Sequence, residues 1–112
     1  MPLPFQVPYY TPTSNSFTGS QTSANGAGVC TLASTDYVAV VATVNARYMR
    51  IGNTHATADI YVNELGSAAN AGVMVGTKLG PGGGIVWDYQ VPATAIHVAS
   101  PTASATYFVV VA

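Results

Sequence analysis

Alternation of apolar and polar residues is the feature that most limits how this chain can fold. In residues 47–52, Met49 and Ile51 share one side of the pattern, and in residues 58–65 Ile60 and Val62 do so. A period of two places successive side chains on opposite faces of a β-strand, so each stretch predicts a strand with one buried face. No stretch of useful length has the periodicity of an amphipathic helix. Further predicted strands lie at 37–44, 85–91, 95–99 and 105–112.

Turn-forming residues separate these predicted strands. Glycine and proline fill positions 80–84, and Pro101 begins another turn. Short strands with turn signals roughly every 8–12 residues are typical of small sandwiches and barrels. The sequence therefore predicts an all-β fold, a small antiparallel β-sandwich or jelly-roll-like barrel, over residues 30–112. The stretches 47–52 and 58–65 are predicted to form an antiparallel hairpin. The predicted interior contains Met49, Ile51, Ile60, Val62, Trp87, Ile96 and Val109.

Residues 1–29 differ from the rest of the chain. Prolines at positions 2, 4, 8 and 12 fix their own φ and push the preceding residues toward extended geometry, which excludes a helix. We interpret residues 1–29 as an extended N-terminal arm, of which residues 1–28 are disordered when free and become ordered on a partner. The alternative is a passive disordered tail. The predicted partner-binding residues are the apolar and aromatic side chains Leu3, Phe5, Val7, Tyr9, Tyr10 and Phe17.

Charged residues are unusually scarce. They make up 6% of the chain, against about 25% in an average soluble domain. Little charge leaves a free monomer poorly protected against association, and the cores of protein interfaces are depleted of charge. We therefore expect other subunits to cover much of the surface. The alternative is an ordinary surface of uncharged polar residues.

The charge balance also excludes two classes of partner. The net charge is −1, and the basic residues are Arg47, Arg50 and Lys78. Nucleic-acid binders neutralise phosphates with many basic residues, and binding to an anionic membrane surface needs a basic cluster. We therefore predict neither a nucleic-acid nor a membrane partner.

No constellation of reactive residues points to an enzyme. His55 and His97 belong to separate predicted elements, which is not the spacing of metal ligands. Cys30 is a single cysteine without a surrounding signature, and we expect it to act as a small buried apolar residue. The glycine-rich stretch 80–84 precedes a strand, whereas a phosphate loop needs a following helix. The prediction is no catalytic residue, no cofactor and no metal.

The order of motifs from residue 47 onward resembles a known class of proteins. Arg47-Tyr-Met-Arg-Ile-Gly-Asn is followed by Ala58-Asp-Ile-Tyr-Val-Asn, by Gly76-Thr-Lys-Leu-Gly-Pro-Gly-Gly and by Ala95-Ile-His-Val-Ala, with a β-branched closing strand. This order resembles small structural proteins of tailed bacteriophages that decorate or cement capsids. The resemblance implies a protein that binds the outer capsid lattice and stabilises the phage head. Its implied partners are the major capsid protein and further copies of itself, in a homotrimer or another cyclic oligomer.

The location implied by the resemblance is the capsid surface of the virion, after synthesis in the host cytoplasm. Two other functions stay open from the sequence. One is a tail, baseplate or fibre component of a phage virion. The other is a carbohydrate-binding β module that uses Trp87 with nearby tyrosines, because aromatic rings also stack on sugars.

Overall fold

The structure is a computed structural model that describes residues 15–16, 26–42 and 46–112, with residues 15 and 16 described by their backbone alone. Every regular element in these residues is a strand, and no helix there is long and apolar enough to cross a membrane. The strands are β1 (Asn15–Ser16), β2 (Gly26–Cys30), β3 (Tyr37–Val40), β4 (Tyr48–Asn53), β5 (Ile60–Asn63), β6 (Ala69–Asn70), β7 (Val73–Met74), β8 (Thr77–Leu79), β9 (Gly84–Asp88), β10 (Ile96–Ala99) and β11 (Ala105–Val111).

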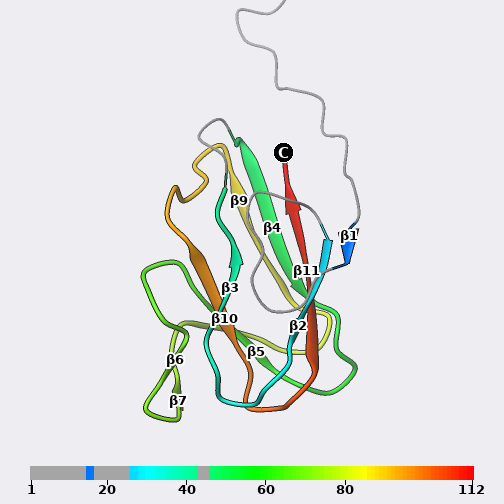
Figure 1. The fold of residues 1–112 in the computed structure, drawn as a ribbon. Coiled ribbons are helices and arrows are strands. Elements are labelled where there is room, and N and C mark those ends of the chain that lie inside the picture. The colour runs from blue at the N-terminus through cyan, green and yellow to red at the C-terminus, as the bar shows by residue number, and fades with distance from the viewer. Residues whose placement is uncertain (1–14, 17–25, 43–45) are drawn as a thin grey trace, which may run out of the picture.

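Nine of these strands form two sheets that pack face to face (Figure 1), and β6 and β7 pair only with each other. Sheet A has the strand order β1-β2-β11-β4-β9, and sheet B has the order β3-β10-β5-β8. All pairs in both sheets are antiparallel except β1 with β2, which is parallel. The short β6–β7 hairpin projects from the lower end of the sandwich in Figure 1. The predicted all-β antiparallel sandwich is thus confirmed.

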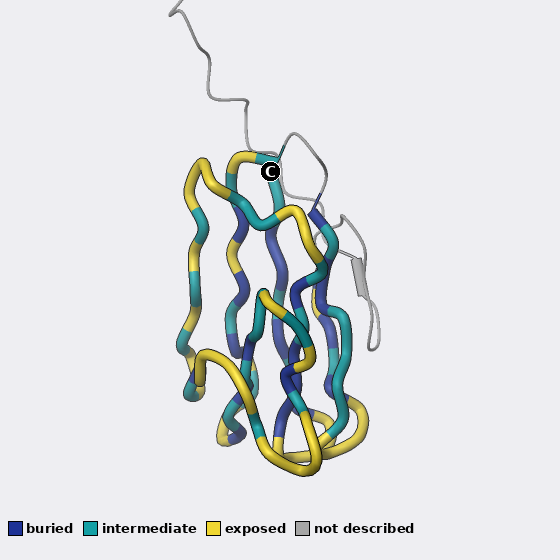
Figure 2. Tube along the Cα trace, turned by 90° about the vertical axis from the view of Figure 1, so that its left-hand side faces the viewer, coloured by how far each residue is buried: buried dark blue, intermediate teal, exposed yellow. Residues whose placement is uncertain are grey.

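The core lies between the two sheets, where the alternation predicted it. Figure 2 shows buried residues along the strands and exposed ones concentrated in the loops. Trp87 is only partly buried, but it packs against the core cluster. The remaining predicted interior residues are all at most 2% exposed: Met49, Ile51, Ile60, Val62, Ile96 and Val109.

The first full strand of sheet A starts inside the stretch that the sequence assigns to the arm. Gly26–Val29 are the first four residues of β2, which pairs with β11. Glycine is a poor strand former, so local sequence gave no signal for this strand. Tertiary packing explains it: the buried ring of Tyr107 covers Gly28, and a Cβ at position 28 would collide with that ring. The rest of the predicted arm lies outside the described residues, apart from the two residues of β1.

The predicted hairpin of 47–52 with 58–65 is wrong. β4 pairs with β11 and β9 in sheet A, whereas β5 pairs with β10 and β8 in sheet B. The connection between them crosses from one sheet to the other. Asn53 holds this corner, because its Nδ2 donates to the carbonyl oxygens of Ala58 at 2.7 Å and Leu79 at 2.9 Å. Alternation reports which face of a strand is buried, but it does not identify the neighbouring strand.

The closing strand β11 lies between β2 and β4, in the interior of sheet A. Tyr107 and Val109 point into the core and are fully buried. Phe108 and Val110 alternate with them and therefore belong to the outer face, where Phe108 is half-buried and Val110 is buried. Because β11 is paired on both sides, its two apolar faces do not belong to a sheet edge, where they would favour aggregation.

Candidate functional site

The outer face of sheet A is built from the alternate residues of four strands. The register aligns Ala27, Phe108, Gly52 and Gly84 in one row across β2, β11, β4 and β9. The next row contains Val110, Arg50 and Val86. Apart from Arg50, these two rows carry no charge, and Val86 is 52% exposed. This face is therefore largely apolar, and it is open at Val86 but closed at Val110, which is only 2% exposed.

A shallow hollow of about 780 Å³ lies on this face. Gly52 and Gly84 are directly paired and carry no side chain, so backbone forms the floor. Phe108, Val86 and Arg50 stand around it, and Gly82, Gly83 and Thr54 close its end. Glycine inside a strand often marks a place where a ligand or another backbone approaches closely. The hollow is thus the candidate binding site of sheet A.

The end of the hollow is fixed by hydrogen bonds to the backbone of Asn53. Its N–H donates to the oxygen of Gly83 at 2.8 Å, and its oxygen accepts from the N–H of Gly82 at 3.0 Å. The side chain is only 2% exposed and makes the two bonds that hold the β4–β5 corner. One asparagine therefore connects the glycine-rich turn to both sheets.

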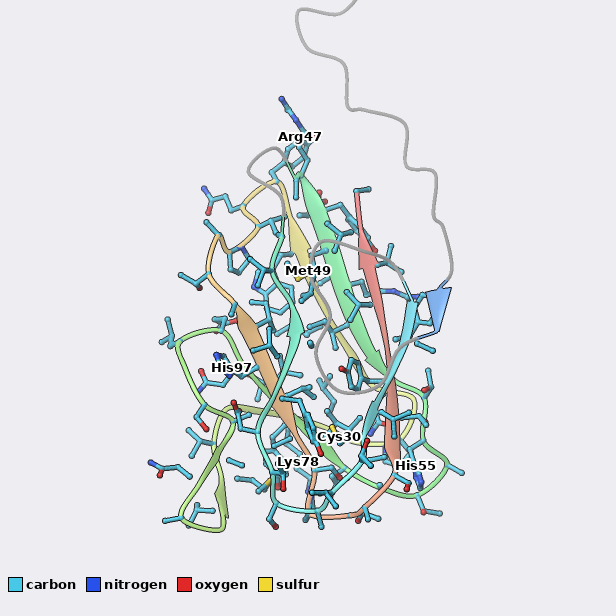
Figure 3. The ribbon with its side chains drawn as sticks, in the orientation of Figure 1. Cys30, Arg47, Met49, His55, Lys78 and His97 are labelled. Carbon is cyan, nitrogen blue, oxygen red and sulfur yellow. The ribbon has the colours of Figure 1, made fainter. Side chains whose placement is uncertain are left out.

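His55 completes the same corner. The backbone N–H of His55 donates to Asn53 Oδ1 at 2.9 Å. The ring Nδ1 accepts from the backbone N–H groups of Thr57 and Ala58 at 3.1 and 2.9 Å. An imidazole nitrogen accepts only when it carries no proton. His55 therefore acts as a structural acceptor in a loop, and Figure 3 shows it far from His97.

The outer side of sheet B carries polar chemistry instead. His97 Nδ1 lies 2.6 Å from Asp36 Oδ2, and the N–H of Ala68 donates to Asp36 Oδ1 at 2.6 Å. A second, smaller hollow of about 360 Å³ lies beside His97 and is also lined by Glu64, Leu65 and Thr94. The Thr94 hydroxyl donates to the carbonyl oxygen of Glu64 at 3.1 Å. The His–Asp pair therefore joins strands and loops, with no aligned nucleophile among these neighbours.

The remaining reactive groups of the described residues are separated or buried. No group of three or more His, Cys, Asp or Glu side chains there is placed to hold a metal ion. Cys30 is fully buried, and burial, aided by the charge of Asp36, raises the pKa of its thiol from 9.0 to about 12. A thiol needs its ionised form to act as a nucleophile. Cys30 is therefore a packing residue, as the sequence indicated.

Within the described residues, Trp87 and Tyr89 do not form a shared aromatic platform for a sugar. Trp87 faces the interior and packs against the core. Tyr89 is two residues further on, where strict alternation would place it on the same face as Trp87, but it lies beyond the end of β9, has a φ of 69° and is 53% exposed. The left-handed backbone at Tyr89 breaks the alternation, so the two rings do not share a face.

Exposed large apolar side chains also gather on the segment between β5 and β8. Leu65 is 91% exposed, Val73 61% and Val75 39%. All three belong to residues 64–76, which contain the projecting β6–β7 hairpin. We call this segment the 64–76 loop. Its sequence, rich in glycine and alanine, predicted a loop with at most a short strand and gave no signal for a surface of this kind.

The predicted partner-binding residues Leu3, Phe5, Val7, Tyr9, Tyr10 and Phe17 lie outside the described residues. The structure thus adds two surfaces that sequence reasoning missed, the hollow and the 64–76 loop. Gly52 was the available signal for the hollow, because a glycine interrupts an otherwise regular strand pattern.

Comparison of the chain with protein-family models, with curated proteins and with solved structures gave no match.

Proposed function

We propose that this chain is a structural protein of a bacteriophage virion, which binds the outer capsid lattice as a decoration or cement protein. The observation that carries the proposal is the 64–76 loop with Leu65, Val73 and Val75 exposed to solvent. Burying such a side chain in an interface contributes roughly 1.5–3 kcal/mol before ordering is subtracted. A lattice-binding protein repeats such contacts at every copy, so modest local affinity gives firm attachment.

Two further features support the proposal. Charged residues make up 6% of the chain, which suits surfaces that become covered. The motif order from residue 47 onward resembles phage decoration proteins. The proposed partners are the major capsid protein and further copies of this chain, with a trimer as the first choice of oligomer.

Co-sedimentation with purified expanded capsids tests the proposal. The double variant Leu65→Asn, Val73→Thr replaces the two most exposed of the three apolar side chains, and we expect capsid affinity to fall about tenfold or more. Leu32→Asn is the matched control, because Leu32 is 61% exposed on a different loop. The control should bind as the unmodified chain does, and all three proteins should melt at similar temperatures.

The same preparations separate the alternatives. Equal binding of the double variant and the unmodified chain would show that the 64–76 loop is not the attachment surface. Binding to purified tails but not to capsids would replace the decoration role with a tail or fibre role. Retention on a glycan array without binding to either particle would support the carbohydrate-binding alternative.

A further inference from the structure

The hollow of sheet A has a floor of bare backbone beside apolar side chains, an arrangement that suits an extended chain. Its floor is the paired backbone of Gly52 and Gly84, and its walls are Phe108 and Val86. A second sheet would pack through its side chains onto a face without such a depression. A narrow segment can instead lie on the glycines with its side chains against the walls.

We infer that this hollow receives residues 2–10 of a second copy of the chain. The segment contains Pro2, Pro4 and Pro8 between apolar and aromatic residues. Proline-rich segments dock into aromatic-lined grooves because they are already extended before binding. Their carbonyl groups form no internal hydrogen bonds, so the Arg50 guanidinium at the rim can donate to them.

Charge supports this choice of occupant. Residues 1–29 contain no Asp, Glu, Lys or Arg. The hollow has one charged residue in its lining, Arg50. An uncharged segment therefore enters without burying an unpaired charge of its own.

The direction of the chain favours a second copy over the same one. β1 runs parallel to β2, and Asn15 and Ser16 lie level with Gly26 and Ala27. Asn15 therefore lies nearer than Ser16 to the end of sheet A where β11 finishes. The hollow is centred level with Ala27: Arg50 and Val86 lie on the side where β11 finishes, and Thr54, Gly82 and Gly83 lie on the side where β4 finishes.

To fill the hollow of its own copy, the segment would have to turn back past Asn15, so we infer a second copy as its source. Fourteen extended residues span about 45 Å, which is enough to reach a neighbouring copy.

Binding of the segment to a second copy does not require a capsid, so the purified protein alone is sufficient for the test.

Gly52→Val is the central variant. A Cβ at position 52 would meet no atom closer than the oxygen of Gly83, at 3.9 Å, and valine favours strands. The substitution therefore fills the floor of the hollow without disturbing the strand. We expect it to raise the self-dissociation constant about tenfold or more, measured by light scattering and sedimentation, with the melting temperature unchanged or higher. Thr77→Val, at an exposed position of β8, is the matched control and should leave self-association unchanged.

A second measurement locates the occupant. A peptide of residues 1–12 is titrated onto the isotope-labelled full chain, and amide shifts are followed by NMR. Shifts concentrated at Gly52, Gly82, Gly83 and Gly84 support the inference, provided that a peptide with Phe5, Val7 and Tyr9 replaced by serine has no effect. A monomeric mass at every concentration, equal self-association of Gly52→Val and the unmodified chain, or peptide shifts confined to the 64–76 loop would each overturn it.

Discussion

The two sheets of the sandwich place their chemistry on opposite sides. Sheet A buries the thiol of Cys30 and the phenol of Tyr107, and it presents Phe108, Val86 and Arg50 on its outer face. Sheet B buries aliphatic side chains, and His97 with its partner Asp36 lies on its outer side, each about a quarter exposed. Both sheets have the same alternating pattern, so the pattern alone does not decide which outer face meets water. The identity of the alternate residues makes the face of sheet A suitable for a partner and that of sheet B suitable for solvent.

The largest expected effect concerns the corner that supports the hollow. Asn53→Ala leaves the buried carbonyls of Ala58 and Leu79 without their side-chain donor. We expect the free energy of unfolding to fall by about 2–4 kcal/mol, because unsatisfied buried groups are costly. Urea denaturation measures it.

The matched control for this corner is Asn63→Ala on sheet B. Asn63 also organises a loop, through bonds to Ser67 and Leu65, but these bonds are exposed. Its loss should lower stability by about 1 kcal/mol or less. Equal effects of the two variants would contradict the distinction between a fixed hollow and a solvated loop.

Alkaline pH should destabilise the protein through the interior of sheet A. Burial raises the pKa of Cys30 to about 12 and that of Tyr107 above its usual range, so the folded state keeps both protons after the unfolded state has lost them. Below pH 9 neither group lowers the free energy of unfolding, because both are protonated in the folded and unfolded states. Above pH 9 the free energy of unfolding falls as pH rises. Between its unfolded-state pKa and its folded-state pKa, each group lowers the free energy of unfolding by about 1.4 kcal/mol per pH unit.

Denaturation series between pH 8 and pH 11 measure this slope. In Cys30→Ala the thiol is absent, so the slope should be shallower between pH 9 and pH 11 than in the unmodified chain. An unchanged slope in that variant would show that Cys30 ionises equally in the folded and unfolded states.

A moderate effect is expected at the polar side of sheet B. Asp36→Ala removes the acceptor shared by His97 and the N–H of Ala68. We expect a loss of about 1–2 kcal/mol, since both bonds are only partly buried. Asp36→Asn keeps an acceptor for Ala68 and should recover part of the loss. Thermal unfolding compares the two, and an equal loss in both would assign the whole effect to the carboxylate charge.

The smallest effect is expected at the ion pair of Lys78 with Asp59. The Nζ–Oδ2 distance is 3.5 Å, and the lysine side chain is 58% exposed. Exposed pairs contribute about 0–1 kcal/mol and are screened by salt. Lys78→Ala should therefore change the melting temperature little, and less still at high salt. A large loss would show that the outer face of sheet B is more than a solvated surface.

Sequence by itself determined the fold class and the buried face of most strands. Met49, Ile51, Ile60 and Val62 follow the period of two and are all buried. Local alternation is sufficient here, because a strand must turn its apolar side away from water whichever strand lies next to it. The burial of Cys30 followed from the same preference of a small apolar residue for the interior.

Tertiary structure alone decided the strand neighbours, and with them the candidate sites. Strand pairing joins residues far apart in the chain, such as Gly52 with Gly84 and Gly28 with Tyr107. The hollow exists because two glycines from different strands meet in one row, and β2 is ordered because an aromatic ring covers its glycine. The corner at Asn53 sends β4 and β5 into different sheets through side-chain bonds that a hydrophobicity pattern does not contain. Short-range patterns record burial, whereas these features depend on long-range contacts between residues that carry little pattern of their own.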